Sequence, residues 1–263
     1  MPDTTAPQTQ ITTEAPPPED GWRPDLGALR ARLDEIDDKI HDLLMDRARV
    51  VENVARSGKA AAFRPGREAS ILRRLLARHT GKLPARTLVR MWREMLAGTT
   101  AMQTPVTIAV AGPVASLARE HFGFLTPVTE HPSVDAALAA VRAGTATVAV
   151  MPFPSDAAEW PALTSAEPRL YIVARLPYWA DRPLDVPAGD ALVVGTTPPD
   201  ASGDDRCFIV ADRALLADAG LTPRATHGAV VEVDTMVAED DPRLPAGAIV
   251  LGGYAIPVAG EPS

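Results

Sequence analysis

The chain has 263 residues, of which 46% are hydrophobic and 23% are charged, and this is typical of a soluble protein long enough for two domains. Its formal net charge of −8 at pH 7 argues against general nucleic-acid binding. The single cysteine, Cys207, excludes an intrachain disulfide and a cysteine metal cluster. The N-terminus lacks the pattern of a secretory signal, and no apolar stretch approaches the roughly 20 residues that span a bilayer. We therefore expect a cytoplasmic protein that does not contact membranes.

The N-terminal part of the sequence predicts a tail followed by a long helix. Residues 1–21 are mostly Thr, Pro and acidic residues with almost nothing to bury, so we expect them to be disordered. After Pro24, apolar residues recur at alternating steps of three and four, which predicts a helix with a coiled-coil-like seam as far as Ser57-Gly58. The seam residues are Leu26, Leu29, Leu33, Ile36, Ile40, Leu43, Val50 and Val54.

Two shorter helices are predicted next. One begins at Pro65 and runs to about His79, and the other begins at Pro84 and ends near Gln103. The second of these is expected to bury one face, formed by Leu88, Met91, Trp92, Met95 and Leu96. Because two short helices cannot cover the whole seam of the long one, we expect the helical part to form a dimer.

A charged residue interrupts the seam of the long helix. The seam position after Leu43 is Arg47, and no acidic residue lies one turn away on the same face. An unpaired buried guanidinium is costly, so Arg47 either reaches solvent, pairs with a carboxylate on another helix, or binds an anion. The region between Arg23 and Gln103 is rich in Arg within an acidic chain, and this favours a small anionic ligand.

The shorter helices carry further polar residues at positions that face a helical core. The face of the third helix continues to Thr99 and then to Met102 or Gln103, which either contact a polar ligand or form a frayed, solvated end. In the first turn of the second helix, Glu68 complements the helix dipole, whereas Arg67 is unfavourable without a partner. Together with Arg47 and Lys59, the residues Arg67, Thr99 and Gln103 predict a cationic pocket inside a helical bundle, suited to a small dicarboxylate.

Several motifs in this region resemble the all-helical chorismate mutase family. The resemblance covers about residues 23–104 and rests on residues 26–30, 36–40 and 43–47 of the long helix, on 64–68, and on 91–95 leading to Thr99 and Gln103. It implies an all-α domain at residues 22–104 that forms an intertwined homodimer with two sites, each completed by the partner chain. It also implies an isomerase that needs no cofactor and no metal, and that rearranges chorismate to prephenate by an intramolecular Claisen step.

The resemblance assigns roles to the cations of the long helix. Arg47 would hold one substrate carboxylate, and Arg30 of the partner chain would hold another. The family has a lysine at the end of this helix that donates to the ether oxygen and a carboxylate. Lys59 is the candidate here, although it lies one residue late, and Arg56 is the alternative.

The two shorter helices would complete the implied site. Glu68 would accept a hydrogen bond from the substrate hydroxyl, and Arg67 would support it from the site edge. Thr99 would contact a carboxylate, and Gln103 would donate to the ether oxygen. Some members have Asp before the proline of the second helix, where this chain has Arg64, and that difference would change the hydrogen bonding around the hydroxyl.

The residue pattern changes at Thr104-Pro105, from helical periodicity to short β-rich runs. Helical stretches at 133–143 and 212–219 alternate with short β-rich runs, which predicts an α/β domain over residues 105–263. The runs are 106–110, 147–151, 170–173, 192–194, 207–210 and 248–251.

This second region resembles a shortened prephenate dehydratase without its catalytic motifs. Residues 108–113 are similar to the opening strand and Gly-Pro turn of that family, and residues 231–234 and 252–257 are similar to the tail of its regulatory domain. The family motifs Glu-Gly-Thr, Glu-Asn-Ser and Thr-Arg-Phe are replaced at 114–116, 153–155 and 205–208. We therefore expect a non-catalytic domain that binds an aromatic amino acid effector, holds a partner enzyme, or stabilises the dimer.

Two alternatives stay open at this point. One is a bifunctional chorismate mutase–prephenate dehydratase. The other is a non-catalytic helical dimerisation module with a ligand-binding regulatory domain, in which the arginines only pair with Glu or Asp.

Overall fold

The computed structural model describes residues 25–56, 63–155, 160, 162–164, 167–182 and 189–259. The predicted disordered tail at 1–21 and the candidate Lys59 lie outside these residues. The chain divides into two compact units, Met1–Val50 and Val51–Ser263. Within the described residues, no helix combines the length and the apolar character needed to cross a membrane.

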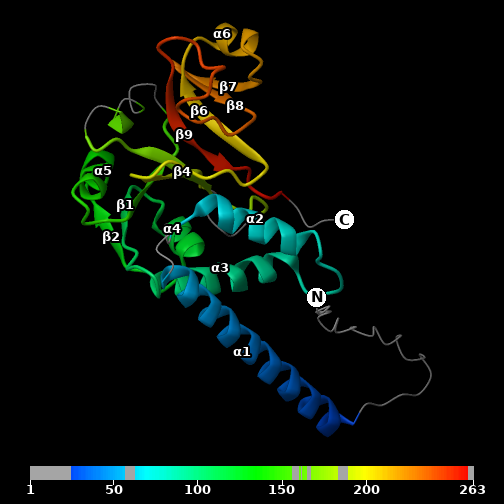
Figure 1. Ribbon diagram of the computed structural model, residues 1–263. Helices are drawn as coiled ribbons and strands as arrows, with labels where there is room; N and C mark the ends of the chain where they lie inside the picture. Colours follow the sequence, from blue (N-terminus) through cyan, green and yellow to red (C-terminus); the bar gives the residue numbers. More distant parts are fainter. Residues whose placement is uncertain are drawn as a thin grey trace, which may run out of the picture. The chain divides into compact units, whose positions relative to one another are not determined.

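The first unit is formed by most of helix α1 (Leu26–Arg56), and the predicted long helix is confirmed (Figure 1). The carboxylate of Asp25 accepts from the backbone N–H of Gly27 at 2.9 Å, which satisfies one of the open donors of the first turn. None of the described α1 residues is buried. The seam residues Leu33 and Leu43 are 59% and 68% exposed, so the apolar seam is uncovered in the single chain.

The two shorter helices predicted from the sequence are α2 (Pro65–Leu76) and α3 (Ala85–Ala101), and both belong to the second unit. Pro65 stands in the first turn of α2, where its fixed φ suits the helix and its missing N–H costs nothing. Helix α2 ends three residues earlier than expected, at Leu76. Both helices pack their buried residues against Tyr178 and Trp179 of the following domain.

The buried face of α3 differs from the predicted one. Met91 is 51% exposed, and Leu88, Trp92 and Met95 are only half-buried. The helix instead buries a neighbouring stripe, which consists of Ala85, Val89, Arg93, Leu96 and Thr100. The two faces share the buried Leu96, and α2 with the second domain covers the predicted face only in part, because Leu88 and Trp92 pack at the edge of the cluster that Ala85 and Val89 form with Tyr178 and Trp179.

The described strands of the second unit form one nine-stranded sheet, which confirms the predicted α/β class. Its order is β2-β1-β3-β5-β4-β9-β6-β8-β7. The strands are β1 (Ile108–Ala111), β2 (Val128–His131), β3 (Val148–Pro152), β4 (Tyr171–Leu176), β5 (Ala191–Gly195), β6 (Asp205–Val210), β7 (Pro223–His227), β8 (Val230–Val233) and β9 (Ile249–Ala255).

The sheet has two differently built halves (Figure 1). In the first, α4 (Ala115–Phe122) and α5 (Val134–Arg142) connect β1, β2 and β3, which pair in parallel. In the second, α6 (Arg213–Asp218) connects β6 to β7, and the strand order β9-β6-β8-β7 is that of a split βαβ unit. The described residues between β8 and β9 contain no helix, so a loop stands where that unit has its second helix.

The halves meet where β4 pairs with β9 through Ile172 and Gly252. Gly252 has φ +111, and a Cβ there would lie 2.2 Å from the carbonyl oxygen of Ile172. Only glycine allows this conformation and this close approach of the two strands.

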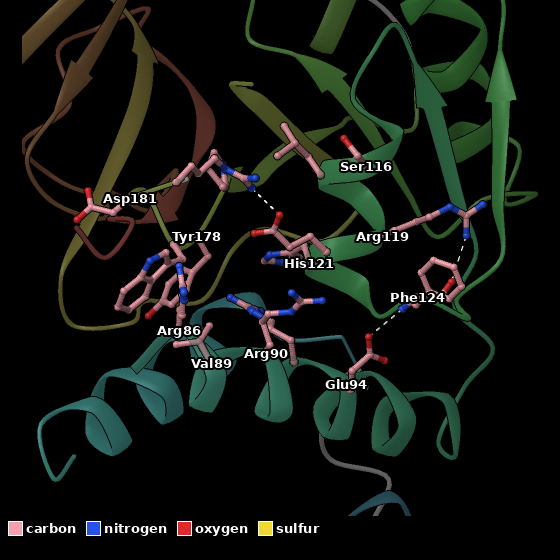
Figure 2. A pocket seen from close by; sticks show the side chains of 16 residues that line it. Arg86, Val89, Arg90, Glu94, Ser116, Arg119, His121, Phe124, Tyr178 and Asp181 are labelled. Atoms are coloured by element: carbon pink, nitrogen blue, oxygen red, sulfur yellow. Dashed lines mark hydrogen bonds and ion pairs between the residues drawn. The ribbon is translucent and has the colours of Figure 1, made fainter. Parts of the chain in front are cut away.

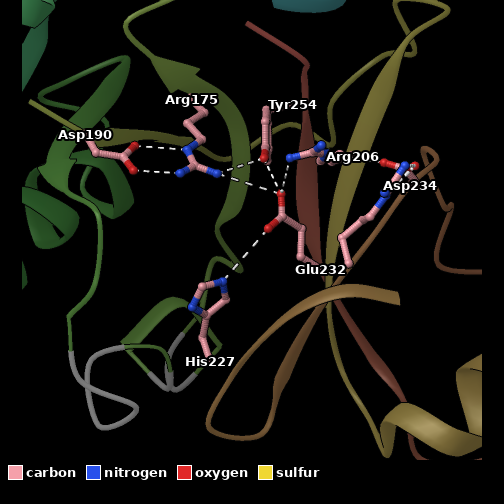
Figure 3. Close-up of polar contacts among 8 residues, drawn as sticks. Arg175, Asp190, Arg206, His227, Glu232, Asp234 and Tyr254 are labelled. Atoms are coloured by element: carbon pink, nitrogen blue, oxygen red, sulfur yellow. Dashed lines mark hydrogen bonds and ion pairs between the residues drawn. The ribbon is translucent and has the colours of Figure 1, made fainter. Parts of the chain in front are cut away.

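A buried polar network also links the halves (Figure 3). Glu232 on β8, with a side chain 4% exposed, accepts from the Tyr254 hydroxyl on β9 and pairs with Arg206 on β6 at 3.4 Å. Arg175 on β4 donates to the Tyr254 hydroxyl at 2.9 Å and pairs with Asp190 at 2.6 Å. Since each charge in the network has an opposite partner, the buried acid is compensated.

Candidate functional site

The predicted site residues lie on all three N-terminal helices. Arg30 and Arg47 lie on α1, the first exposed and the second half-buried. Arg67 and Glu68 lie in the first turn of α2, and Thr99 lies in the last turn of α3, followed by Gln103. Arg56, the alternative to Lys59, is the last residue of α1, and its Nη2 atom lies 3.6 Å from Oε2 of Glu52.

Glu68 is held by an arginine that the sequence reasoning did not select. The Nη1 atom of Arg93 on α3 donates to Oε2 of Glu68 at 2.9 Å, and the two side chains are 5% and 14% exposed. Burial lowers the pKa of Arg93, and the neighbouring Glu68 charge opposes that shift. The guanidinium also lies 4.6 Å from the centroid of the Tyr178 ring, which gives it a cation–π contact.

The first turn of α2 is anchored to the second domain through Asp200. The backbone N–H of Gly66 donates to Oδ1 of Asp200 at 3.2 Å, and Arg64 pairs with Oδ2 at 3.1 Å. A Cβ at Gly66 would lie 2.0 Å from the backbone oxygen of Asp200. Arg64, which the sequence singled out as a departure from the family, therefore joins α2 to the second domain.

Two turns further along α2, Arg73 makes a second anchor. Its guanidinium donates to the Ser202 hydroxyl at 2.6 Å and to the backbone oxygens of Asp204 and Ile256 at 2.7 and 2.8 Å. The second domain thus sets the position of the helix that carries Arg67 and Glu68.

The polar residues at the end of α3 make bonds within their own helix. The hydroxyl of Thr99 donates to the backbone oxygens of Met95 and Leu96, at 2.9 and 3.1 Å. The side-chain amide of Gln103 donates to the Thr99 backbone oxygen at 3.3 Å. A ligand at this end of α3 would exchange these local bonds for its own.

The described residues contain no group of three or more His, Cys, Asp or Glu side chains arranged to hold a metal ion. The lone Cys207 is buried in β6, and burial raises the pKa of its thiol to about 12. This cysteine is packed as a core residue.

Comparison with known proteins identifies the class of the N-terminal segment. Residues 29–104 match the family model of chorismate mutase type II. The bifunctional chorismate mutase/prephenate dehydratases of Pseudomonas aeruginosa and Stutzerimonas stutzeri are 32% and 30% identical over 139 residues, which cover 48% of this chain and 38% of each relative. The enzyme of the same name from Neisseria gonorrhoeae is 32% identical over 111 residues, which cover 40% of this chain and 31% of the relative. The chain thus spans under two fifths of the length of these relatives.

Three solved structures match this chain with low TM-scores and low sequence identity. Prephenate dehydratase from Arthrobacter aurescens in complex with L-Phe has a TM-score of 0.40 and 15% identity, over 57% of this chain and 90% of that one. Prephenate dehydratase from Streptococcus mutans has a TM-score of 0.38 and 13% identity, over 57% and 98%. GqqA, described as a novel type of quorum quenching acylase, has a TM-score of 0.37 and 17% identity, over 57% and 94%.

The resemblance stated from the motifs is confirmed. The chain carries a type II chorismate mutase segment at residues 29–104, followed by a mixed α/β domain. The curated relatives are named for two activities, mutase and dehydratase, in one chain.

Proposed function

We propose that this protein is a chorismate mutase, an isomerase that rearranges chorismate to prephenate. The observation that carries the proposal is the match of residues 29–104 to the type II mutase family, because the candidate cations and hydrogen-bonding residues on α1, α2 and α3 fall within it. The reaction is intramolecular and needs no proton transfer. The protein has to hold the reactive diaxial conformer and stabilise the charge that develops as the ether bond breaks.

The active form that we propose is a homodimer that shares α1 between chains. Arg30 and Arg47 are 17 positions apart on one unbroken helix, which separates them by about 26 Å at 1.5 Å per residue. One small dicarboxylate cannot contact both from the same chain. The two arginines can serve one substrate only if they come from different chains, and the uncovered seam of α1 supplies the apolar surface for such a pairing.

The roles of the site residues are part of the proposal. Arg47 and the Arg30 of a second chain clamp the carboxylates, and Glu68, oriented by Arg93, accepts from the substrate hydroxyl. Thr99 and Gln103 turn from their own helix to a carboxylate and the ether oxygen. Arg67 supports the site edge, and Lys59 or Arg56 supplies the remaining cation.

For the second domain we propose a non-catalytic role. Its contacts through Asp200, Ser202 and Tyr178 hold α2 and α3, which supports a positioning function. The bifunctional enzyme is the second candidate, and the names of the curated relatives favour it. The two are separated by whether prephenate is converted to phenylpyruvate. An aromatic amino acid effector and a cytoplasmic location stay predictions from the sequence.

A pair of substitutions on α1 tests the mutase against a bare dimerisation module. Arg47→Ala should abolish chorismate rearrangement while size-exclusion chromatography with light scattering still shows the dimer. Arg49→Ala is the matched control, since Arg49 is exposed and pairs with Asp46 on its own helix. Loss of the dimer in Arg47→Ala, with the rate per folded site unchanged, would instead support the dimerisation module.

A further inference from the structure

A cavity of about 600 Å³ lies between α3, α4 and the segment after β4 (Figure 2). All of its walls belong to the second unit. It is distinct from the proposed mutase site, because none of the candidate residues for that site lines it. Cavities of this size hold small organic ligands.

Two arginines of α3 supply positive charge to this cavity. Arg86 and Arg90 lie one helical turn apart, are exposed, and extend from α3 into the cavity, Arg86 beside Tyr178 (Figure 2). Neither forms an ion pair with any described residue. By contrast, Arg182, in the segment after β4, is compensated by Glu120 at 2.5 Å. The α3 side therefore carries two arginines without an ion-pair partner among the described residues, and its carboxylate, Glu94, accepts from the backbone N–H of Phe124 at 3.0 Å.

A buried histidine forms the wall opposite these arginines. His121 is 8% exposed, and neither of its ring nitrogens has a hydrogen-bond partner among the described residues. Burial and the nearby Arg93 hold its pKa well below the usual 6.5, so the ring is neutral and presents one donor and one acceptor. Buried polar atoms of this kind are nearly always hydrogen-bonded in native proteins, so a ligand in the cavity can use the donor or the acceptor of this ring.

Aromatic and apolar side chains complete the lining. Phe124 borders the cavity with 68% of its surface exposed, and Tyr178 and Trp179 form the side next to Arg86. The Arg119 guanidinium lies 5.8 Å from the centroid of the Phe124 ring and donates to its backbone oxygen at 3.1 Å. Phe124 and Tyr178 lie at opposite ends of the cavity (Figure 2), so the aromatic end next to Arg86 is formed by Tyr178 and Trp179, and this end suits a flat apolar ring.

We propose that this cavity binds a small carboxylate that carries a flat apolar ring, as in an arylacetate. The carboxylate pairs with Arg86 and Arg90, His121 supplies a polar contact, and the ring lies against Tyr178 and Trp179. Arg93 connects the cavity to the mutase helices, because it lines the cavity and donates to Glu68. Occupancy should therefore alter chorismate turnover, a consequence that rests on the proposed function.

Three matched probes test the site by calorimetry on the full chain without chorismate. Phenylacetate has ring and charge, phenylacetamide has the ring alone, and acetate has the charge alone. Phenylacetate should bind saturably and at least about tenfold more tightly than either partial probe. Equal binding of acetate would overturn the ring contact, equal binding of phenylacetamide would overturn the arginine contact, and no saturable binding would overturn the site.

The double variant Arg86→Gln/Arg90→Gln should weaken phenylacetate binding by about tenfold or more. Arg78→Gln is the control, because Arg78 is an exposed arginine outside the cavity. Unfolding curves for both variants establish that they fold, which both exposed positions should permit. Unchanged binding in the double variant would contradict the proposal. Since binding is measured without substrate, its failure and a failure of the mutase assay are distinguishable.

Discussion

Arg93 on α3 donates to Glu68 on α2 at 2.9 Å, and both side chains lie largely out of solvent. The pair joins the two shorter helices of the mutase segment at a point that also touches Tyr178 of the second domain. A candidate catalytic carboxylate is thus oriented by a residue that faces the α/β domain. This arrangement makes the position of Glu68 depend on the packing of α3 against that domain.

Removal of Arg93 should destabilise the protein strongly. Arg93→Ala leaves the Glu68 carboxylate without its buried partner, which costs about 3 kcal/mol of unfolding free energy. The double variant Arg93→Met/Glu68→Leu should recover most of this loss, because it removes both charges and keeps the apolar volume. Urea denaturation measures both. A loss within about 0.5 kcal/mol for the single variant, the usual range for surface sites, would show that the pair is not important for stability.

Two glycine-to-alanine substitutions should have opposite effects on stability. Gly66→Ala places a Cβ at 2.0 Å from the Asp200 backbone oxygen, so α2 must move away from the second domain and stability must fall. Gly98→Ala on α3 meets nothing within 4 Å, and should stabilise by about 0.5–1 kcal/mol through helix propensity. Thermal unfolding of the two variants compares them directly. If Gly66→Ala were as stable as the parent, the anchor at Asp200 would be wrong.

The hydroxyl of Tyr254 should contribute stability that disappears at alkaline pH. Burial, with the hydrogen bond to Glu232, raises the pKa of Tyr254 from 10.0 to about 12. The folded state therefore keeps this proton longer than the unfolded chain does. The contribution is complete below pH 10 and is lost as the pH rises toward about 12.

The variant Tyr254→Phe isolates this contribution. It removes a donor from the buried Glu232, and should cost about 1–2 kcal/mol of unfolding free energy at pH 7. Chemical denaturation measures the free energy of unfolding of both proteins between about pH 8 and 12. The difference between them should shrink above about pH 10. A constant difference over this range would argue against the raised pKa.

The pH profile of chorismate rearrangement tests the role proposed for Gln103. A side-chain amide donates a hydrogen bond at every pH, so the rate should change little between about pH 6 and 8, where only histidines ordinarily titrate. Gln103→Glu should be most active at low pH and lose activity as the carboxyl ionises above about pH 4.3, because a carboxylate cannot donate. A steep fall in the parent protein across neutrality would contradict this role.

The elements with strong periodicity could be predicted from the sequence. The three N-terminal helices and six of the strands follow from apolar spacing. Strand β2 was not predicted because its Val-Thr-Glu-His sequence lies at a partly exposed sheet edge. Helix α4 was not predicted because it begins at Ala115 and its N-cap residue Val114 offers no side-chain cap. Strand β7 is the other edge strand and begins with Pro223-Arg224, which is unusual in a sheet.

The details of the site depend on contacts that are distant in the sequence. The buried face of α3 is chosen by Tyr178 and Trp179, more than seventy residues away, so the periodicity of α3 alone could not select between its two apolar faces. The pair between Arg93 and Glu68 was missed for the same reason. A clue was present, because Arg93 falls on the apolar stripe between Val89 and Leu96.

The most direct test of the central claim is a chorismate assay on the purified full chain. The loss of chorismate absorbance is followed in time, and the mixture is then assayed for phenylpyruvate without acid treatment. We predict that chorismate is consumed and that prephenate accumulates alone, as expected for a mutase with a non-catalytic second domain. Phenylpyruvate would instead establish the bifunctional enzyme, and no loss of chorismate would contradict the proposed mutase activity.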